Sequence, residues 1–510
     1  MITLIPRLFF LLLCLVVISG AIATGSVVGP SYAEVADARM ALAPVLKSVP
    51  DRITTSIAEN RLASVSMAIV LDNHIIFSQA FGYADVERQI RATTETIYPL
   101  GSVTKVFVAT MLAQLCERDI VGLEDPLQKY VPEYKPFSPF AGTRLTTLRQ
   151  LAAHTSGLPL DAPVNFWCNF SGFSWLVTGG QTEMTWFVDC QTLLASLSSL
   201  ELVYAPEVHA HYSNLNIQLL GLALERACEQ SLVEYVETEI FTPLGMGDTT
   251  FELDSEKRGR LARGYVCTGP DSPLLPAPDY ELGCAVYSGG LFSTVKDMVH
   301  FLSFQFQKES TENSRVLRAG TLRRMRTPQS IHRLGVHECY GLGWGVVRIG
   351  NHDAIEHNGA LLGYHAHISA VPDLGLGIVA LSNSKNFLWR PDACKDLARS
   401  ILADLADALV TASPAPEFEP AAVDLAAYEG WYALPGDVAH LEVSPAAGGI
   451  HVNLIEVPDF TEIFALVGLH TFCFASDPAQ TPMLFFSTTP DGKVENVKFL
   501  SYTFRRQEQP

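Results

Sequence analysis

Hydrophobic residues form short runs separated by polar turns at both ends of the first 410 residues, with longer stretches between them. Residues 64–71 and 75–81 flank a polar turn, a pattern that predicts a β-hairpin. Two more strand-like runs, residues 365–371 and 376–381, flank a second turn. Strands at both ends with helical sequence between them predict an α+β domain at residues 35–410, whose sheet joins the two ends of the domain.

Helical periodicity fills the middle of this domain. Residues 102–118 are apolar on nearly every side of a helix, which is typical of a helix buried within a core. Apolar side chains at every third or fourth position predict several further helices. These helices are expected at residues 35–60, 145–153, 214–230, 294–307 and 391–410.

The character of the sequence changes after residue 410. Residues 411–425 are rich in proline and alanine and are expected to form a linker. Residues 426–510 then contain short apolar runs separated by turn residues, which predict a small all-β barrel or sandwich. Its strands are expected at residues 430–432, 440–443, 450–455, 463–467, 472–474, 483–487 and 494–499.

The first 23 residues have the organisation of an export signal. Arg7 precedes the apolar residues 8–18, and Ala21-Ile22-Ala23 offers a small-residue cleavage site. The apolar run is shorter than the roughly 20 residues that span a bilayer, which favours a cleaved signal peptide over an uncleaved signal-anchor. A cleaved signal predicts a secreted or extracytoplasmic protein, and an uncleaved one predicts membrane anchoring through the N-terminus.

Composition narrows the classes of function. With 48% hydrophobic and 17% charged residues, the 510-residue chain can bury large cores. Its formal net charge of −19 opposes binding to phosphate backbones, so no nucleic-acid partner is expected.

Cysteine use fits an exported protein. The chain has ten cysteines, and those that bracket two loops predict the disulfides Cys168–Cys190 and Cys267–Cys284 in an oxidising compartment. The alternative is a set of scattered buried thiols. Asn169-Phe170-Ser171 is also a glycosylation sequon if the host is eukaryotic.

Ser102-Val103-Thr104-Lys105 places a serine and a lysine three positions apart at the predicted start of a helix. Residues i and i+3 share one face of a helix, so the amine can lie beside the hydroxyl and act as its base. The helix N-terminus favours a developing negative charge, and burial lowers the pKa of an amine. Ser293 and Lys296 repeat the same spacing, so the pattern by itself is weak evidence.

Two downstream sequences contain further groups that could act together with a nucleophilic serine and its lysine base. In Tyr212-Ser213-Asn214, the phenol of Tyr212 is a candidate base, or an acid for the leaving group, and Asn214 can orient a substrate. In the H-x-G sequence at residues 357–359, Gly359 lets the backbone approach a ligand closely. The N–H of Ala360 can then form an oxyanion hole with the N–H of Ser102. A packed tyrosine and an ordinary turn glycine are the structural alternatives.

In this order, the three motifs resemble those of the penicillin-recognising serine hydrolases, specifically the branch related to class C β-lactamases. That branch includes β-lactamases, D-alanyl-D-alanine carboxypeptidases, D-aminopeptidases, esterases and metazoan β-lactamase-like proteins. The resemblance covers residues 40–410 and includes Pro99-Leu100-Gly101, Gly122-Leu123-Glu124-Asp125-Pro126, Tyr130-Val131-Pro132, the HTSGL sequence at 154–158 and the segment at 288–294. It implies a β-lactamase/transpeptidase-like domain, with an antiparallel sheet flanked by helices and an all-helical subdomain. Residues 426–510 resemble the lipocalin-like β domain that some members append.

The resemblance also implies a mechanism. Ser102 attacks a carbonyl and becomes acylated, Lys105 and Tyr212 carry the proton, and water releases the acyl group. The implied partner is a small-molecule or peptide substrate with an amide or ester bond, and no cofactor is implied. His357 stands where β-lactamases have a lysine that holds a substrate carboxylate, which favours a peptide or ester over a β-lactam. A catalytically silent scaffold or ligand-binding protein is the alternative, although it has no need of all three catalytic groups.

Two further patterns carry less weight. His209 with His211, and His365 with His367, would each face one side of a strand, but no acidic or cysteine partner lies at ligand spacing, so no metal is expected. The aromatic residues between 166 and 175 are expected to pack against their own domain, and an apolar pocket or a lipid contact is the alternative.

Overall fold

A computed structural model describes most of the chain between residues 32 and 507. Its described residues exclude positions 141, 143, 208–209, 268, 270–271, 280, 308–315, 330–337, 386–391, 413–423, 435–438, 447–448, 457–460, 469–470, 475–483, 489–492 and 500–501. The expected signal segment and most of the expected linker therefore lie outside the described residues. Among the helices that are described, none combines the length and the apolar character needed to cross a lipid bilayer.

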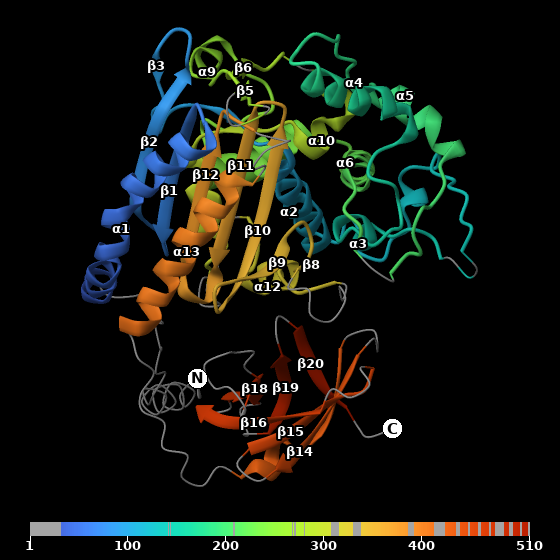
Figure 1. Ribbon diagram of the computed structural model, residues 1–510. Coiled ribbons are helices and arrows are strands. Elements are labelled where there is room, and N and C mark those ends of the chain that lie inside the picture. The colour runs from blue at the N-terminus through green and yellow to red at the C-terminus, as the bar shows by residue number, and fades with distance from the viewer. Residues whose placement is uncertain are drawn as a thin grey trace, which may run out of the picture.

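The larger part of the molecule is built on an antiparallel sheet (Figure 1). At its centre β1 (Ser64–Leu71) pairs with β12 (Leu376–Ser382), in a register that runs from Ser66 opposite Leu381 to Leu71 opposite Leu376. The prediction that the sheet joins both ends of the domain is therefore confirmed. The order β3-β2-β1-β12-β11-β10-β9-β8 is completed by β2 (His74–Asp85), β3 (Ile90–Arg91), β8 (Glu338–Tyr340), β9 (Gly345–Ile349), β10 (His352–Leu361) and β11 (Tyr364–Val371).

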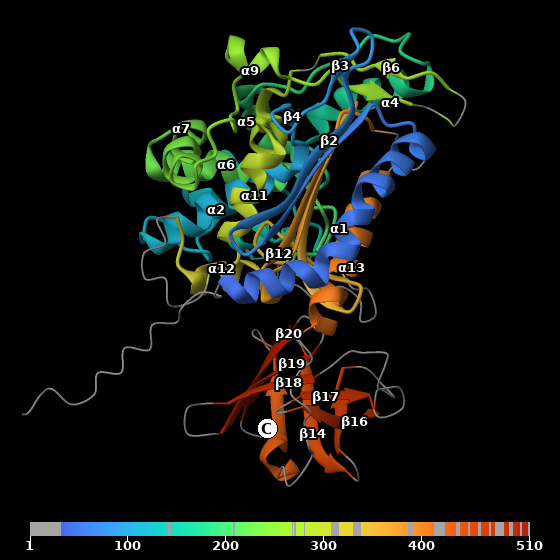
Figure 2. The same cartoon turned by 90° about the vertical axis from the view of Figure 1, so that its left-hand side faces the viewer.

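Helices cover both faces of this sheet. On one face lie α1 (Tyr32–Asn60) and α13 (Ala393–Ala412), which run side by side across the strands (Figure 2). Their apolar side chains pack on the strand residues that point toward them, for example Leu402 with Ile378 in one cluster. On the other face lie α2 (Thr104–Glu117) and α11 (Val295–Phe304). Because both faces are covered, every residue of β1 and β12 is buried.

The remaining helices include those of the expected helical subdomain. Residues 104–115 of α2 are all buried, which confirms the prediction of a helix that is apolar on every side. The other helices are α3 (Leu148–Ala152), α4 (Phe166–Val177), α5 (Cys190–Ser196), α6 (Asn214–Cys228), α7 (Leu232–Val236), α8 (Thr242–Leu244), α9 (Ser255–Gly259), α10 (Val286–Gly289) and α12 (Ala319–Met325). In Figure 1, α3, α4, α5 and α6 lie together at one side of the sheet, in the expected helical subdomain, whereas α9 and α12 lie near the upper and lower ends of the sheet. Two small ribbons pair β4 (Tyr98–Pro99) with β7 (Phe292–Ser293), and β5 (Tyr265–Val266) with β6 (Leu275–Pro276).

The C-terminal residues form a separate closed barrel of antiparallel strands, as predicted. Seven of its strands correspond to the expected ones, and β20 closes the barrel by pairing with β13. Pattern analysis missed β20 because Phe504 is followed at once by Arg505 and Arg506, so the apolar alternation is too short to read. The strands are β13 (Gly430–Ala433), β14 (His440–Ala446), β15 (Gly449–Leu454), β16 (Thr461–Gly468), β17 (Thr471–Phe474), β18 (Leu484–Thr488), β19 (Val494–Phe499) and β20 (Tyr502–Gln507).

The disulfide prediction was wrong in its pairing. The structure joins Cys190 to Cys284, whereas Cys168 and Cys267 have free thiols. The pairing follows from the fold, because the backbone N–H of Cys284 donates to the carbonyl of Val188 and brings the two segments together. The two half-cystines are 94 positions apart, so a rule that pairs cysteines across the nearest loop cannot find them.

Candidate active site

Ser102 and Lys105 lie where the chain enters the buried helix α2. Ser102 is in a single 3₁₀ turn, Gly101–Val103, and Lys105 follows in the first turn of α2. The Lys105 Nζ lies 3.0 Å from the Ser102 Oγ and donates a hydrogen bond of 2.8 Å to the carbonyl oxygen of Ser288. The i, i+3 spacing therefore places the amine beside the hydroxyl, as the sequence predicts.

The surroundings of Lys105 alter its proton affinity. Its side chain is 0% exposed, and this burial lowers the pKa of the amine to about 7, although the negative charge of Asp161 opposes the shift. An ordinary lysine is fully protonated at neutral pH, whereas about half of the Lys105 amines are neutral at a pH equal to that pKa. The amine is thus able to accept a proton under physiological conditions.

Tyr212 reaches the same point from another part of the chain. It precedes α6, whose N-terminus is capped by the Ser213 side chain accepting from the Asn216 N–H. The Lys105 Nζ lies 5.1 Å from the centroid of the Tyr212 ring, and the His154 ring packs at 4.7 Å on the ring. Burial raises the pKa of Tyr212, and a hydrogen bond with Ser102 only partly opposes this effect, so the phenol keeps its proton at neutral pH.

The third predicted motif lies on β10, beside the turn that carries Ser102. A Cβ atom on Gly359 would lie 1.8 Å from the carbonyl oxygen of Leu100, so only glycine allows this approach. Gly101, in turn, has φ +53° and faces the backbone of Ala360, whose nitrogen would lie 2.9 Å from a Cβ on Gly101. Two glycines thus bring the backbones of Ala360 and Ser102 side by side.

His357 is buried and neutral. Burial and the nearby Lys105 lower the pKa of its imidazole to about 3, and its Nδ1 lies 2.8 Å from the carbonyl oxygen of Asn358. Its Nε2 is buried and has no hydrogen-bond partner among the described residues. Its ring centroid lies 6.4 Å from that of Tyr212, so His357 belongs to the same site.

Of the four histidines considered as metal ligands, one has other partners and one lies outside the described residues. His367 uses both ring nitrogens, with Nδ1 2.6 Å from the Asn358 Oδ1 and Nε2 3.1 Å from the Ser369 Oγ. His209 lies outside the described residues. Within the described ranges, no cluster of three or more histidine, cysteine, aspartate or glutamate side chains could hold a metal ion.

The second serine–lysine pair serves a structural purpose. Ser293 is buried and its Oγ lies 2.7 Å from the Thr249 Oγ1, whereas Lys296 forms an ion pair with Glu95. The two side chains therefore have different partners, and the motif here marks the start of α11.

Asp161 was not singled out from the sequence, and Ser288 was noted only as the first residue of the segment 288–294, without a role. Asp161 accepts hydrogen bonds from the Asn214 Nδ2 at 3.2 Å and from the Asn169 Nδ2 at 3.3 Å, so it orients two amides beside Ser102. Ser288 holds Lys105 through its carbonyl oxygen. A backbone contact leaves no side-chain signal, and Asp161 belongs to no motif, so only the folded chain reveals either role.

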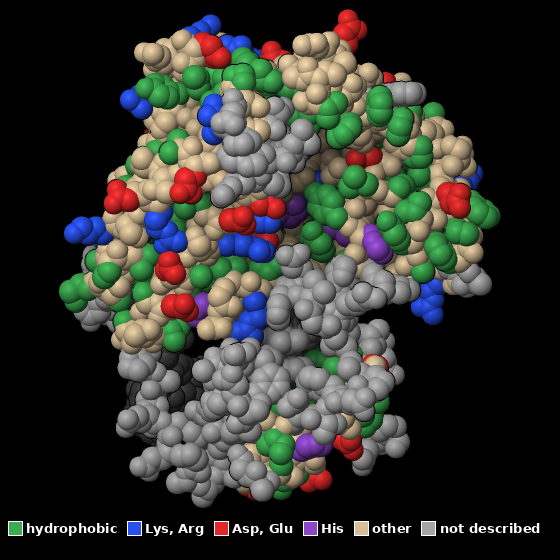
Figure 3. All heavy atoms as spheres, viewed as in Figure 1, with side chains coloured by type: hydrophobic (Ala, Val, Ile, Leu, Met, Phe, Trp, Pro, Cys, Tyr) green, Lys and Arg blue, Asp and Glu red, His purple; other side chains and the backbone are tan. Residues whose placement is uncertain are grey.

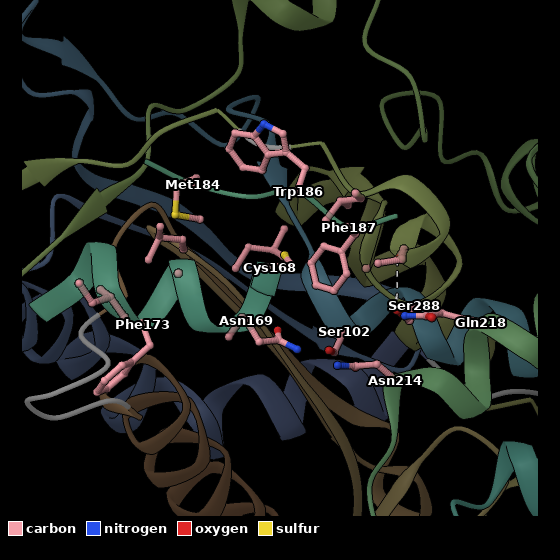
Figure 4. A pocket seen from close by; sticks show the side chains of 18 residues that line it. Ser102, Cys168, Asn169, Phe173, Met184, Trp186, Phe187, Asn214, Gln218 and Ser288 are labelled. Atoms are coloured by element: carbon pink, nitrogen blue, oxygen red, sulfur yellow. Dashed lines mark hydrogen bonds between the residues drawn. The ribbon is translucent and has the colours of Figure 1, made fainter. Parts of the chain in front are cut away.

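Two cavities meet at Ser102. The first, which we call the insert cavity, has a volume of about 550 Å³ and lies between α4, residues 184–187, residues 282–289 and the end of β10. Figure 4 shows Ser102, Asn169 and Asn214 close together at one side of it, with Phe187 above them. The second, the polar cavity, has a volume of about 340 Å³ and is lined by Tyr212, His357 and Glu356 among others. The molecular surface is hollowed in this region, where hydrophobic and histidine side chains gather (Figure 3).

The fold places the protein among the β-lactamase/transpeptidase-like folds. A family model described as Beta-lactamase matches residues 49–403, which is well over half of the chain. The protein therefore belongs to the β-lactamase family.

Curated relatives agree with this assignment over part of their length. Beta-lactamase-like protein 2 of Dictyostelium discoideum is 29% identical over 289 residues, which is 56% of this chain and 49% of that protein. Protein flp of Staphylococcus aureus strain MW2 is 26% identical over 334 residues, 65% of this chain and 61% of that protein. The chain thus spans about half to three fifths of the curated relatives that it matches.

Solved structures share the fold. The octameric penicillin-binding protein homologue from Pyrococcus abyssi superposes with a TM-score of 0.59 at 22% identity, covering 90% of this chain and 99% of that one. The β-lactamase/D-alanine carboxypeptidase from Yersinia pestis gives a TM-score of 0.57 at 22% identity and covers 74% and 100%.

Proposed function

We propose that the protein is a serine hydrolase that cleaves amide or ester bonds through an acyl-enzyme on Ser102. The observation that carries the proposal is the 3.0 Å contact between the Ser102 Oγ and the Nζ of a fully buried lysine. A hydroxyl is a poor nucleophile until a base removes its proton, and a desolvated amine is such a base. Family membership supports the same class of reaction.

In the proposed acylation step, the Ser102 Oγ attacks the carbonyl carbon and its proton passes to the Lys105 Nζ. The carbonyl oxygen becomes negative and accepts hydrogen bonds from the N–H groups of Ser102 and Ala360. The bond to the leaving group then breaks, and the leaving atom takes a proton. Water attacks the resulting ester in the same way, which returns Ser102 and releases the carboxylic acid.

We assign the protonation of the leaving group to Tyr212. A phenol whose pKa is raised by burial is a donor at neutral pH rather than a base, which separates the role of Tyr212 from that of Lys105. Its proton can be replaced from Lys105, whose Nζ lies over the phenol ring. Asn214, held by Asp161, is assigned to orient the acyl part of the substrate.

His357 is proposed to contact substrate as a neutral group. Because its pKa is lowered to about 3, it carries no positive charge with which to hold a carboxylate at neutral pH. This supports a peptide or ester substrate over a β-lactam, since a charged donor in that position holds an anion more strongly.

A fluorophosphonate probe tests the proposal directly, because it phosphonylates activated serines. We expect the probe to label the wild-type protein and not to label Ser102→Ala. Ser293→Ala is the matched control, because it removes the serine of the other S-x-x-K sequence and should keep its label. Absent labelling of folded wild type, or equal labelling of Ser102→Ala, would favour the silent-scaffold alternative.

We also propose that residues 35–410 act as the catalytic domain, that 411–425 link it to the β domain at 426–510, and that the protein works outside the cytoplasm. The Cys190–Cys284 disulfide supports an oxidising compartment. Mass spectrometry of the N-terminus of the mature protein tests the cleavage of residues 1–23.

A further inference from the structure

The wall of the insert cavity is mainly apolar. Its side chains come from the helix α4 and the segment after it on one side, and from residues 282–289 and the end of β10 on the other. The apolar members include Phe173, Leu176, Met184, Trp186, Phe187 and Leu361. A volume of about 550 Å³ falls within the range of about 300–1,000 Å³ that is typical of small-molecule sites.

The two cavities differ in chemistry at the point where they meet. Ser102 and Ala360 line both of them, so a carbonyl placed between these residues extends one substituent into each cavity. Tyr212 lines only the polar cavity, and Asn214 lines only the insert cavity. A leaving group has to reach the proton of Tyr212, so it belongs on the polar side. The acyl group therefore belongs in the insert cavity.

The apolar surface continues outward from this cavity. Phe173 lines the cavity and is also 56% exposed, and Phe166 and Phe170 on the same helix are exposed as well. Figure 3 shows hydrophobic side chains gathered on this side of the molecule. An apolar substituent thus meets mainly apolar side chains between the surface and the polar groups around Ser102.

From this arrangement we propose that the substrate is an ester or amide whose acyl half is an extended hydrocarbon chain, as in a fatty acid, and whose leaving group is polar. The inference rests on the proposed hydrolase function and specifies its substrate class. The chain lies in the insert cavity, with its carbonyl carbon at the Ser102 Oγ.

The cavity wall is held in a defined position. The Cys190–Cys284 disulfide joins the segment after Phe187 to the segment that contains Leu282. A Cβ on Gly283 would lie 2.4 Å from the Val188 carbonyl oxygen, which shows how closely these two backbones pack. A rigid cavity discriminates between acyl chains of different length better than a deformable cavity does, because an added methylene group either fits or collides with the wall.

A series of p-nitrophenyl esters from acetate to octanoate, each below its solubility limit, tests the proposal. Burial of one methylene contributes about 0.8 kcal/mol, so kcat/KM should rise about fourfold for each added methylene until the cavity is full. A flat or falling series from an enzyme that hydrolyses the acetate would overturn the inference and leave the hydrolase function intact. If neither the acetate nor the fluorophosphonate probe reacts, the hydrolase function itself fails.

Gly172 offers a position from which a larger side chain would occupy the cavity. It lies in α4, lines the cavity, and a Cβ there would meet only the Met184 Cε, at 3.8 Å. We expect Gly172→Phe to lower the ratio of kcat/KM for octanoate to kcat/KM for acetate at least tenfold. Val177→Phe is the matched control, because Val177 is 54% exposed on the same helix. An equal response of the two variants to chain length would overturn the placement of the acyl chain.

Gln218 provides the opposite test. It lines the insert cavity, is 0% exposed, and neither atom of its amide has a hydrogen-bond partner in the described part of the chain. The amide is already shielded from water, so leucine would replace two unsatisfied polar atoms in the cavity wall by apolar surface. Gln218→Leu should therefore raise kcat/KM for octanoate several-fold relative to acetate. A fall in kcat/KM for octanoate alone would show that the amide binds a polar group of the acyl half. That result would overturn the proposal that the acyl half is a plain hydrocarbon chain.

Discussion

Lys105→Met should stabilise the folded protein while it abolishes catalysis. Methionine matches the unbranched apolar part of the lysine side chain, which is fully buried, and lacks only the terminal amine. Lys105 has a folded-state pKa of about 7, against an ordinary value of 10.5. The unfolded chain therefore binds one proton more than the folded chain between these two pH values, and burial of the amine opposes folding at neutral pH.

The size of the effect follows from that difference. A shift of one pKa unit corresponds to about 1.4 kcal/mol, so the lysine costs the folded state about 5 kcal/mol below pH 7 and about 4 kcal/mol at pH 7. The variant leaves the Ser288 carbonyl without its donor, which costs about 1–3 kcal/mol. We therefore expect a net gain of about 2 kcal/mol in the free energy of unfolding at pH 7.

The pH dependence isolates the contribution of the amine from that of the lost hydrogen bond. As the pH rises from 7 toward 10.5, the free energy of unfolding of the wild type increases, because the unfolded chain also loses the lysine proton. The variant has no amine at this position, so its free energy of unfolding does not change for this reason. The difference between them should shrink by about 2 kcal/mol between pH 7 and pH 9. Urea unfolding followed by tryptophan fluorescence at pH 7, 8 and 9 measures it. A difference that stays constant with pH would refute a lowered pKa for Lys105.

Three further outcomes are expected. The kcat/KM for an ester should rise with pH through about 7 and then level off, as Lys105 loses its proton; a profile flat from pH 5 to 9 would exclude the amine as the base. Tyr212→Phe should lower kcat by about 10²–10⁴ for amides but much less for p-nitrophenyl esters, whose leaving group needs no proton; equal losses on both substrates would argue for another role. Gly359→Ala should displace β10 from Leu100, so fluorophosphonate labelling and the thermal midpoint should both fall, and unchanged labelling would contradict the close backbone approach.

The sequence predicts most of the fold because the main elements have strong periodic patterns. The hairpin at residues 64–81 and the helix at 102–118 are local features, and each can be read from a short window. The strands β8, β9 and β10 were not predicted. Polar residues interrupt the apolar runs of β8 and β10, and β9 is a single run of five residues with no polar turn that marks a hairpin. Pairing across long distances, as in the disulfide, leaves no local trace at all.

In the candidate site, too, local motifs were predicted from the sequence, whereas features that depend on distant segments were not. Ser102, Lys105, Tyr212 and Gly359 were predicted from their motifs, and the structure brings them together. An apolar pocket was only the alternative interpretation of the aromatic residues between 166 and 175, because the cavity wall is assembled from segments that are far apart in the chain and carry ordinary apolar residues. The aromatic residues between 166 and 175 were expected to pack against their own domain, and Trp175 does so, whereas Phe173 lines the insert cavity.

The pairing of β1 with β12 has a consequence for how the protein is made. The ribosome synthesises β1 hundreds of residues before β12, the strand that pairs with one edge of β1. Contacts between distant parts of a chain form slowly, and an open strand edge is a template for pairing with other chains. A product of premature termination before Leu376 would keep that edge open permanently. Newly made chains should therefore depend on chaperones, and truncated ones should aggregate.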